Sequence, residues 1–182
     1  MQAALAAYRA HRLGLAFQLY EQLAQEGNAE CQVFVGWMLS EGVGCAKDEA
    51  RARTFFEQAA AQDHPIGSFY FARWLTKQGE HERAYAFYQD GARRNHLPSV
   101  FRVGYSLARG RGVPTDLRRA YKTLGVAARQ GHAFAMREIA IQDLRGRRGF
   151  VFRPIGAIEF LVAVCWGVVV SLFRTDSDLL RG

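Results

Sequence analysis

Residues 41–52, with the sequence EGVGCAKDEARA, combine two glycines, a lysine and an aspartate, which are residue types found in phosphate-binding loops. A glycine-rich loop that opens a helix presents backbone N–H groups and the positive end of the helix dipole to an anion. A P-loop also needs Gly-Lys-Ser/Thr behind a hydrophobic strand, whereas Lys47 is followed by Asp48 and residues 31–40 do not alternate as a strand does. We therefore expect a turn between two helices here, not a phosphate site.

Two other patterns contain residue types that could serve catalytic or metal chemistry. Residues 104–108, GYSLA, place Ser106 in half of a nucleophile elbow, but the second glycine and the preceding strand are missing. His64, His96 and His132 recur at regular spacing, yet equivalent positions in successive helix pairs lie on the order of 10 Å apart. One metal ion with bonds of about 2.1 Å cannot join them. The sequence predicts no catalytic site, no metal site and no cofactor.

The glycine-rich stretch is part of an internal repeat. A shift of 68 residues superimposes four positions on four identical residues: Gly42, Gly44, Asp48 and Ala52 on Gly110, Gly112, Asp116 and Ala120. A shorter copy lies between them, where Ala84 corresponds to Ala52, and a partial copy surrounds Ala16. Asn28, His64, His96 and His132 mark the boundaries between copies. Such a period indicates stacked copies of one supersecondary unit.

Each unit is predicted to be a pair of helices. The first helix of one unit contains Gly36 and Trp37 among few charges, and the second has apolar residues at helical spacing: Ala52, Phe55, Phe56, Ala59 and Ala60. Asp48 and Asp116 precede second helices, where a carboxylate can accept hydrogen bonds from free backbone N–H groups. The expected fold is all-α.

These units resemble the Sel1-like repeat, a relative of the tetratricopeptide repeat. The segments VGWMLSEGVGCAKDEARARTFFEQAAAQDH and VGYSLARGRGVPTDLRRAYKTLGVAARQGH carry the pattern, with Arg51 and Arg119 at a position where the family has lysine. The middle unit has lost the glycine loop and is closer to a tetratricopeptide repeat. The resemblance implies an α-solenoid over residues 1–146. It also implies that the protein acts as an adaptor in a membrane-associated assembly. Such assemblies include complexes that make or export polysaccharide.

The resemblance also implies a partner-binding surface, because the first helix of each tetratricopeptide-like unit lines the concave face. The expected contact positions lie three residues before and one after the small residue of each first helix. They are Val33, Trp37, Phe69, Arg73, Phe101, Tyr105, Arg137 and Ile141. Aromatic residues and arginine are enriched among the residues that dominate binding energy.

Residues 155–173 form the most hydrophobic segment of the chain. Nineteen residues in a helix span roughly 28 Å, close to the thickness of the hydrocarbon core of a bilayer. We expect a membrane-spanning helix here, after a basic linker at 147–154 and before a tail at 174–182. The alternative is a helix that caps the repeat array. Glu159, Ala163, Gly167 and Ser171 recur every four residues and suit contact with another membrane helix, although Glu159 can also pair with Arg153.

Positive charge is concentrated in one part of the chain. Residues 91–153 contain 14 Lys or Arg and 3 acidic residues, whereas residues 1–90 contain 8 and 11. Four arginines come before the hydrophobic segment: Arg145, Arg147, Arg148 and Arg153. By the positive-inside rule they place the repeat domain in the cytoplasm, at anionic lipid headgroups of a bacterial inner membrane. No RNA-binding motif accompanies them, so we expect no nucleic acid partner.

Two classes of function are compatible with these features. The first is a non-enzymatic, single-pass scaffold that binds a protein partner and holds it in a membrane complex. The second is a small membrane enzyme or lipid-modifying subunit that uses Glu159 and the basic block. The second class lacks a nucleophile or metal set. The three cysteines do not recur between repeats, which favours a reducing compartment.

Overall fold

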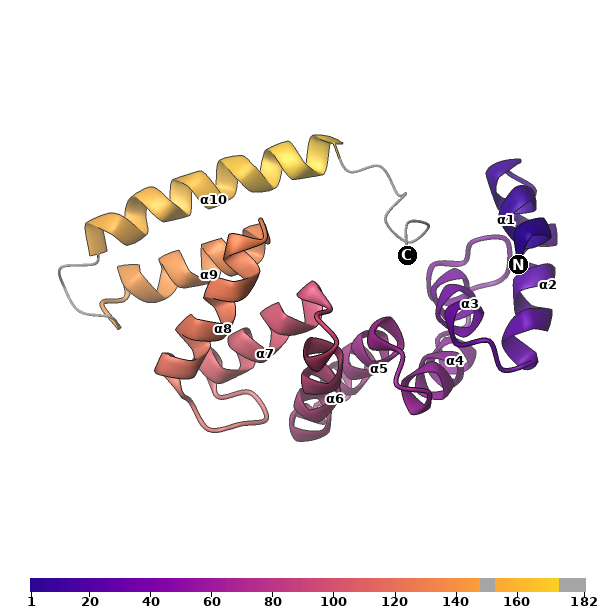
Figure 1. Ribbon diagram of the computed structural model, residues 1–182, viewed down its shortest axis with the longest axis horizontal. Helices are drawn as coiled ribbons and strands as arrows, with labels where there is room; N and C mark the ends of the chain where they lie inside the picture. The colour runs from indigo at the N-terminus through magenta and orange to yellow at the C-terminus, as the bar shows by residue number, and fades with distance from the viewer. Residues whose placement is uncertain (148–152, 174–182) are drawn as a thin grey trace. The chain divides into compact units, whose positions relative to one another are not determined.

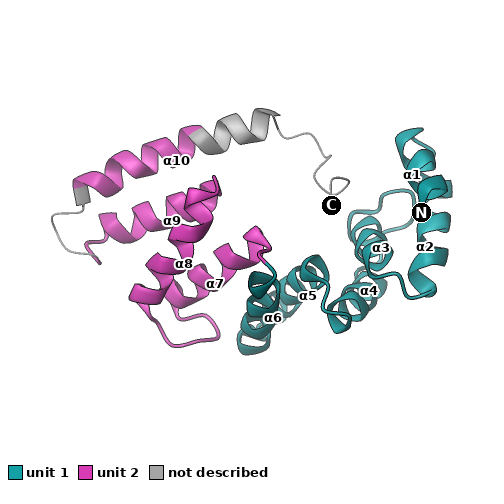
Figure 2. Cartoon of the chain, viewed as in Figure 1, with its two compact units in different colours: residues 1–94 teal, residues 95–182 magenta. Residues whose placement is uncertain are grey.

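The computed structural model describes residues 1–147 and 153–173, and it describes side chains in the last helix for residues 154–165. All regular structure in these residues is α-helical, and the chain divides into two compact units (Figures 1 and 2). Unit 1, Met1–Arg94, contains α1 (Gln2–Arg9), α2 (Leu13–Gln25), α3 (Ala29–Glu41), α4 (Glu49–Ala61), α5 (Pro65–Lys77) and α6 (His81–Arg93). Unit 2, Asn95–Gly182, contains α7 (Leu97–Arg109), α8 (Leu117–Arg129), α9 (Ala133–Leu144) and α10 (Arg153–Phe173).

The glycine-rich stretch is a turn between two helices, as predicted. In unit 1 the helix α3 ends at Gly42, whose φ of 74° is in the left-handed region that glycine adopts without strain. The Asp48 carboxylate then caps α4 by accepting a hydrogen bond from the Arg51 backbone N–H at 3.0 Å. In unit 2 Asp116 caps α8 in the same way. The predicted capping role of both aspartates is confirmed.

The residues that mark the repeat boundaries are the N-caps of the first helices. The Asn28 side chain accepts a hydrogen bond from the backbone N–H of Cys31 at 2.9 Å. His64 and His132 accept one through Nδ1 from the third residue of their helices, at 3.4 and 3.3 Å. An imidazole can act as this acceptor only when Nδ1 carries no proton. These histidines therefore have a local structural role.

Small residues let the two helices of a pair approach closely. A Cβ added at Gly36 on α3 would lie 2.6 Å from the Phe56 ring on α4, and one added at Gly104 on α7 would lie 2.7 Å from Leu124 on α8. Phe56 and Leu124 are both buried, at 5% and 1% exposure. The glycine recurs in both units because a larger side chain there would clash with the second helix of the pair.

The helix α10 packs against α9. A Cβ added at Gly156 would lie 2.8 Å from the Asp143 Cβ and 2.9 Å from the Ala140 carbonyl oxygen, and Ala163 is also buried. The described part of α10 therefore forms a helix pair with α9, which is the packing expected for the capping alternative. Among the described residues no helix has both the length and the apolar character needed to cross a bilayer, so the predicted membrane-spanning helix over 155–173 is not confirmed.

Candidate protein-binding surface

Four of the predicted contact residues lie in unit 1, and they differ in accessibility. Val33 is only 3% exposed and belongs to the core, so it offers little area to a partner. Trp37 and Phe69 are half-buried, and Arg73 on α5 is exposed. The Arg73 guanidinium lies over the ring of Tyr70 at 5.5 Å and over that of Phe69 at 5.9 Å. Arg73 is therefore both accessible and oriented by aromatic neighbours.

The other four predicted residues lie in unit 2, where three of them belong to one aromatic cluster. Phe101 is 5.9 Å from Tyr105 and 6.2 Å from Phe134, measured between ring centroids. The Arg137 guanidinium lies 5.8 Å from the centre of the Phe134 ring. Phe134 is 60% exposed and lies outside the contact positions predicted from the sequence. Ile141 is half-buried on α9. A role of these residues in binding stays a prediction.

A pocket of about 110 Å³ lies within unit 1, between α3, α4 and α5. Its walls are two stripes with the spacing of one helix face. The α4 stripe is Glu49, Ala52, Arg53 and Phe56, and the α5 stripe is Tyr70, Arg73, Trp74 and Lys77. Ser40 and Glu41 from the end of α3, with Lys47 from the glycine loop, complete the lining.

The two stripes face each other through three contacts in antiparallel order. At the outer end the Lys77 ammonium lies 4.0 Å from the Glu49 carboxylate. In the middle the Arg53 guanidinium lies 4.6 Å from the centre of the Trp74 ring. At the inner end the rings of Phe56 and Tyr70 stack at 4.7 Å with an angle of 11° between their planes. Three side-chain pairs thus join the α4 and α5 walls of the pocket.

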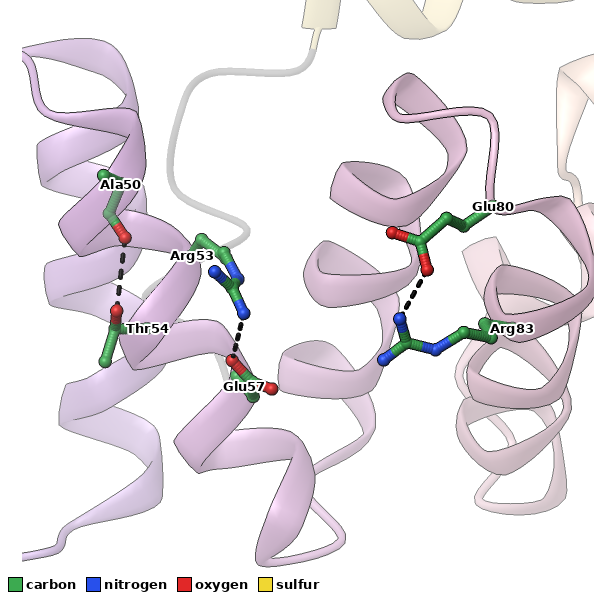
Figure 3. A network of polar contacts seen from close by, with 6 residues as sticks. All are labelled: Ala50, Arg53, Thr54, Glu57, Glu80 and Arg83. Carbon is green, nitrogen blue, oxygen red and sulfur yellow. Dashed lines mark hydrogen bonds and ion pairs between the residues drawn. The ribbon is translucent and has the colours of Figure 1, made fainter.

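The lining is rich in cations, some of which already have partners. Arg53 forms an ion pair with Glu57 at 3.1 Å on the same helix (Figure 3). Glu49 lies 3.3 Å from the Lys47 ammonium and 4.0 Å from that of Lys77. Among the residues that the structure describes, Arg73 forms no ion pair. It is the cation of this pocket best placed to receive an added carboxylate.

Aromatic burial adds an apolar wall beside these charges. Burial raises the pKa of Tyr70 above its ordinary value, with the Arg73 charge opposing the shift and the Glu41 charge adding to it. The phenol is therefore neutral at physiological pH and available for packing or hydrogen bonding. The indole of Trp74 is half-buried and stacks parallel to Phe71 at 6.2 Å. The pocket can accommodate an acidic group next to an apolar one.

Of the residues selected from the sequence, only Arg73 lines this pocket. The other lining residues are recognisable in the sequence as two helix faces, because each stripe has the spacing i, i+3, i+4, i+7. The sequence alone does not give the register of α4 against α5, which decides whether the stripes meet. The backbone N–H groups at the start of α4 do not take part as a phosphate site, since the Asp48 carboxylate already occupies that position.

The described part of α10 has an apolar exposed face. Ile158 and Leu161 are each 65% exposed, and Val162 is 51% exposed, on the helix whose Gly156 and Ala163 face inward. Glu159 is half-buried. Gly167 and Ser171 lie in the part of α10 whose side chains are outside the described residues. The predicted contact with another membrane helix therefore stays a prediction.

The basic block near α10 is described in part. Arg145 and Arg147 are exposed, and Arg147 also donates to the Ala108 carbonyl at 3.3 Å. Arg148 and the side chain of Arg153 lie outside the described residues. Ser106 is buried within α7, and no group of three potential metal ligands occurs in the described part of the chain.

Three segments match the Sel1 repeat family: residues 13–28, 29–64 and 98–132. The unmatched stretch between them contains the shortened middle unit. A Sel1 repeat protein from Oxalobacter formigenes has a similar solved structure, with a TM-score of 0.68 and 22% identity over 82% of this chain and 64% of that one. The chain therefore contains Sel1 repeats within an all-helical repeat fold, as the residue pattern predicts.

Two curated fungal proteins are similar in sequence. The chain is 27% identical over 141 residues to Chitin synthase regulatory factor 3 of Schizosaccharomyces pombe, which is 72% of this chain and 15% of that protein. It is 30% identical over 70 residues to Chitin synthase regulator SKT5 of Saccharomyces cerevisiae, or 38% of this chain and 10% of that protein. The match thus spans a small part of each relative, and the predicted bacterial origin is not supported.

Proposed function

We propose that this chain is a non-enzymatic adaptor that binds a protein partner through the surface of its helical repeats and helps to assemble or regulate a membrane complex. The observation that carries the proposal is the pocket of unit 1, where Arg73, Trp74 and Tyr70 present charge and aromatic area to solvent. These residue types dominate the energy of protein interfaces. Sel1 repeats occur in adaptors, and no constellation for catalysis accompanies the pocket in the described residues.

The names of the relatives favour a complex that makes polysaccharide. Both curated relatives are regulators of chitin synthase, and chitin is a polysaccharide. Since the matched stretch is a small part of each relative, the pathway is a proposal that rests on the repeats they share with this chain. The adaptor would contact the enzyme or one of its regulators rather than the sugar substrate.

The adaptor proposal is tested by cross-linking and pull-down from cells with the full chain. We expect a specific protein partner with the wild type, and about 1 to 3 kcal/mol weaker capture for Trp37→Ala and Tyr105→Ala. Circular dichroism separates lost contact from lost folding. If the wild type captures no protein above an unrelated helical bait, the adaptor proposal fails. If binding and helicity fall together, these two residues belong to the core.

We also infer that α10 holds the chain at a membrane. The support is the apolar face of Ile158, Leu161 and Val162, which is exposed to water, together with the exposed Arg145 and Arg147 after the end of α9. Apolar area and nearby cations together favour binding to anionic lipid, each cation by about 1 kcal/mol. The lipid-facing helix would keep its Gly156 face on α9.

Sedimentation with vesicles of mixed neutral and anionic lipid tests this inference. The variant Ile158→Gln/Leu161→Gln should lose vesicle binding, whereas Phe134→Gln should retain it. Phe134 is a matched control because it is a comparably exposed apolar residue on α9. Equal binding by all three proteins, or no binding by the wild type, would exclude attachment through this face. If the wild type binds vesicles, carbonate extraction of cell membranes distinguishes a helix attached to the membrane surface from a helix that crosses the membrane, because a crossing helix resists extraction.

A further inference from the structure

We propose that the pocket of unit 1 binds an acidic side chain in an extended segment of the partner protein, with an apolar neighbour of that side chain packed on Trp74 and Tyr70. This inference deepens the proposed adaptor function and rests on it. It assigns to this pocket a ligand of defined chemistry, whereas the adaptor function requires only that some surface of the repeats bind a protein.

The size of the pocket favours one side chain over a whole small molecule. Sites for drug-sized ligands have volumes of about 300 to 1,000 Å³. At about 110 Å³ this pocket is well below that range. A nucleotide or a sugar would leave most of its surface outside. A side chain that projects from an extended peptide needs to bury only its own tip, while the peptide backbone runs across the opening.

The charge of the lining favours an acid. Four cationic side chains line the pocket against two carboxylates, Glu41 and Glu49. Glu49 is close to Lys47 and Lys77, at 3.3 and 4.0 Å, and Arg53 is paired with Glu57. Arg73 forms no ion pair among the described residues. A ligand carboxylate would thus meet an unshared guanidinium, with the Lys77 ammonium as its second contact.

Arg73 is also oriented before any ligand arrives. Its guanidinium lies 5.5 Å from the centre of the Tyr70 ring and 5.9 Å from that of Phe69, so two aromatic faces restrict its position. A restrained arginine loses less conformational entropy on binding than a free one, and its planar group can give two parallel hydrogen bonds to one carboxylate. The preference for a carboxylate over a neutral amide follows from this geometry.

The same pocket carries features that suit a peptide backbone and an apolar neighbour. Glu41 and Ser40 also line the pocket, and the Glu41 carboxylate and the Ser40 hydroxyl can each accept a hydrogen bond from a peptide N–H. Trp74 is half-buried, and its indole lies 4.6 Å from the Arg53 guanidinium and 6.2 Å from the Phe71 ring. A leucine beside the acidic residue would cover this ring and exclude water from the ion pair, which strengthens it.

The test uses the full chain and synthetic nine-residue peptides. One peptide has Leu-Glu-Leu at the centre of a glycine and serine background, a second has Leu-Gln-Leu, and a third has Leu-Lys-Leu. Binding is followed by NMR, through the indole N–H signal of Trp74 and the guanidinium signal of Arg73. We expect the glutamate peptide to bind about tenfold more tightly than the glutamine peptide, and the lysine peptide to bind least.

Two sets of variants locate the binding. Arg73→Gln/Lys77→Gln should weaken binding of the glutamate peptide about tenfold. The matched control Arg83→Gln/Arg93→Gln removes the same charge from exposed arginines of α6, outside the pocket, and should leave binding unchanged. Arg73→Glu/Lys77→Glu should reverse the preference in favour of the lysine peptide. Equal binding of the glutamate and glutamine peptides, or an equal loss in the α6 control, would overturn the proposal.

Capture of the natural partner separates this inference from the adaptor function. Partner capture that is lost in Arg73→Gln/Lys77→Gln and kept in the α6 control supports both. Partner capture that is unchanged in the pocket variant refutes the acidic-ligand proposal and leaves the adaptor function standing. Absence of any partner with the wild type refutes the adaptor function itself.

Discussion

Replacement of Arg109 by methionine tests how the repeats of unit 2 are held together. Arg109 on α7 pairs with Glu138 on α9 through two hydrogen bonds, Nε to Oε1 at 2.9 Å and Nη2 to Oε2 at 3.0 Å. The hydrogen bond with Glu138 is the main reason that the pKa of Arg109 is raised above its ordinary value. The two helices belong to successive repeats, so this ion pair joins one repeat to the next.

The magnitude follows from the burial of the two partners. The side chain of Glu138 is 5% exposed and that of Arg109 is 26% exposed. Removal of one partner from a fully buried pair costs about 3 to 5 kcal/mol, because a buried charge is left without compensation. Water reaches part of the Arg109 position, so we expect Arg109→Met to lower the free energy of unfolding by about 2 to 4 kcal/mol. Methionine keeps most of the apolar stem of arginine.

Adding a second substitution should recover part of the stability that Arg109→Met loses. Arg109→Met/Glu138→Gln removes the stranded charge and keeps an oxygen that can accept the hydrogen bond from Gln142. The double variant should be more stable than Arg109→Met alone by about 1 to 2 kcal/mol. Urea unfolding followed by circular dichroism, with hydrogen exchange at the amides of α7 and α9, measures both. A cost of less than about 0.5 kcal/mol for Arg109→Met, or a double variant less stable than the single one, would refute this reasoning.

Three further predictions concern the elements of the repeat. Asp48→Ala and Asp116→Ala should each lower the free energy of unfolding by about 1 kcal/mol in urea titrations, without selective loss of partner capture. Gly36→Ala should cost about 1 to 3 kcal/mol because its methyl group meets a buried ring. The control Gly125→Ala brings its methyl group only to ordinary contact, 3.6 Å from the Arg129 side chain, and should raise or preserve the melting temperature. Burial lowers the pKa of His64, so its neutral form caps α5. The unfolded chain takes up the proton first as pH falls below about 6.5, and the stability contributed by His64 is lost as pH falls further through its folded pKa. His64→Asn should flatten this dependence in melting curves between about pH 7 and pH 5.

Helix pairs and their caps were predictable because the information is local and repeated. A glycine loop followed by an aspartate recurs after 68 residues, and each part has one physical role, a left-handed turn or a carboxylate at a helix start. The role of His64 and His132 as N-caps was less visible, since histidine accepts this hydrogen bond only in one tautomer. Their spacing marked the boundary, and the structure supplies the atom that acts there.

The exposed face of α10 shows where hydrophobicity alone is insufficient. Residues 155–173 have no polar face in the sequence, and this composition predicts a membrane span rather than a cap. The structure places Gly156 against α9, where a small residue allows backbone contact, and leaves Ile158 and Leu161 in solvent. Both observations agree with the composition, because a uniformly apolar helix can pack with any face. Which face packs is decided by the position of the small residues.

The pocket depends on a register that no single helix specifies. The glycines and Lys47 of residues 41–52 are residue types found in phosphate loops, yet the Asp48 carboxylate already caps the start of α4. In the same stretch, the side chains of Lys47 and Glu49 line the pocket instead. In the proposed site Lys77 lies opposite Glu49, and that contact exists because the short turn at 62–64 makes α4 and α5 antiparallel neighbours. A charge pattern on one helix therefore becomes a candidate binding site only when the next repeat brings its aromatic and cationic stripe against it.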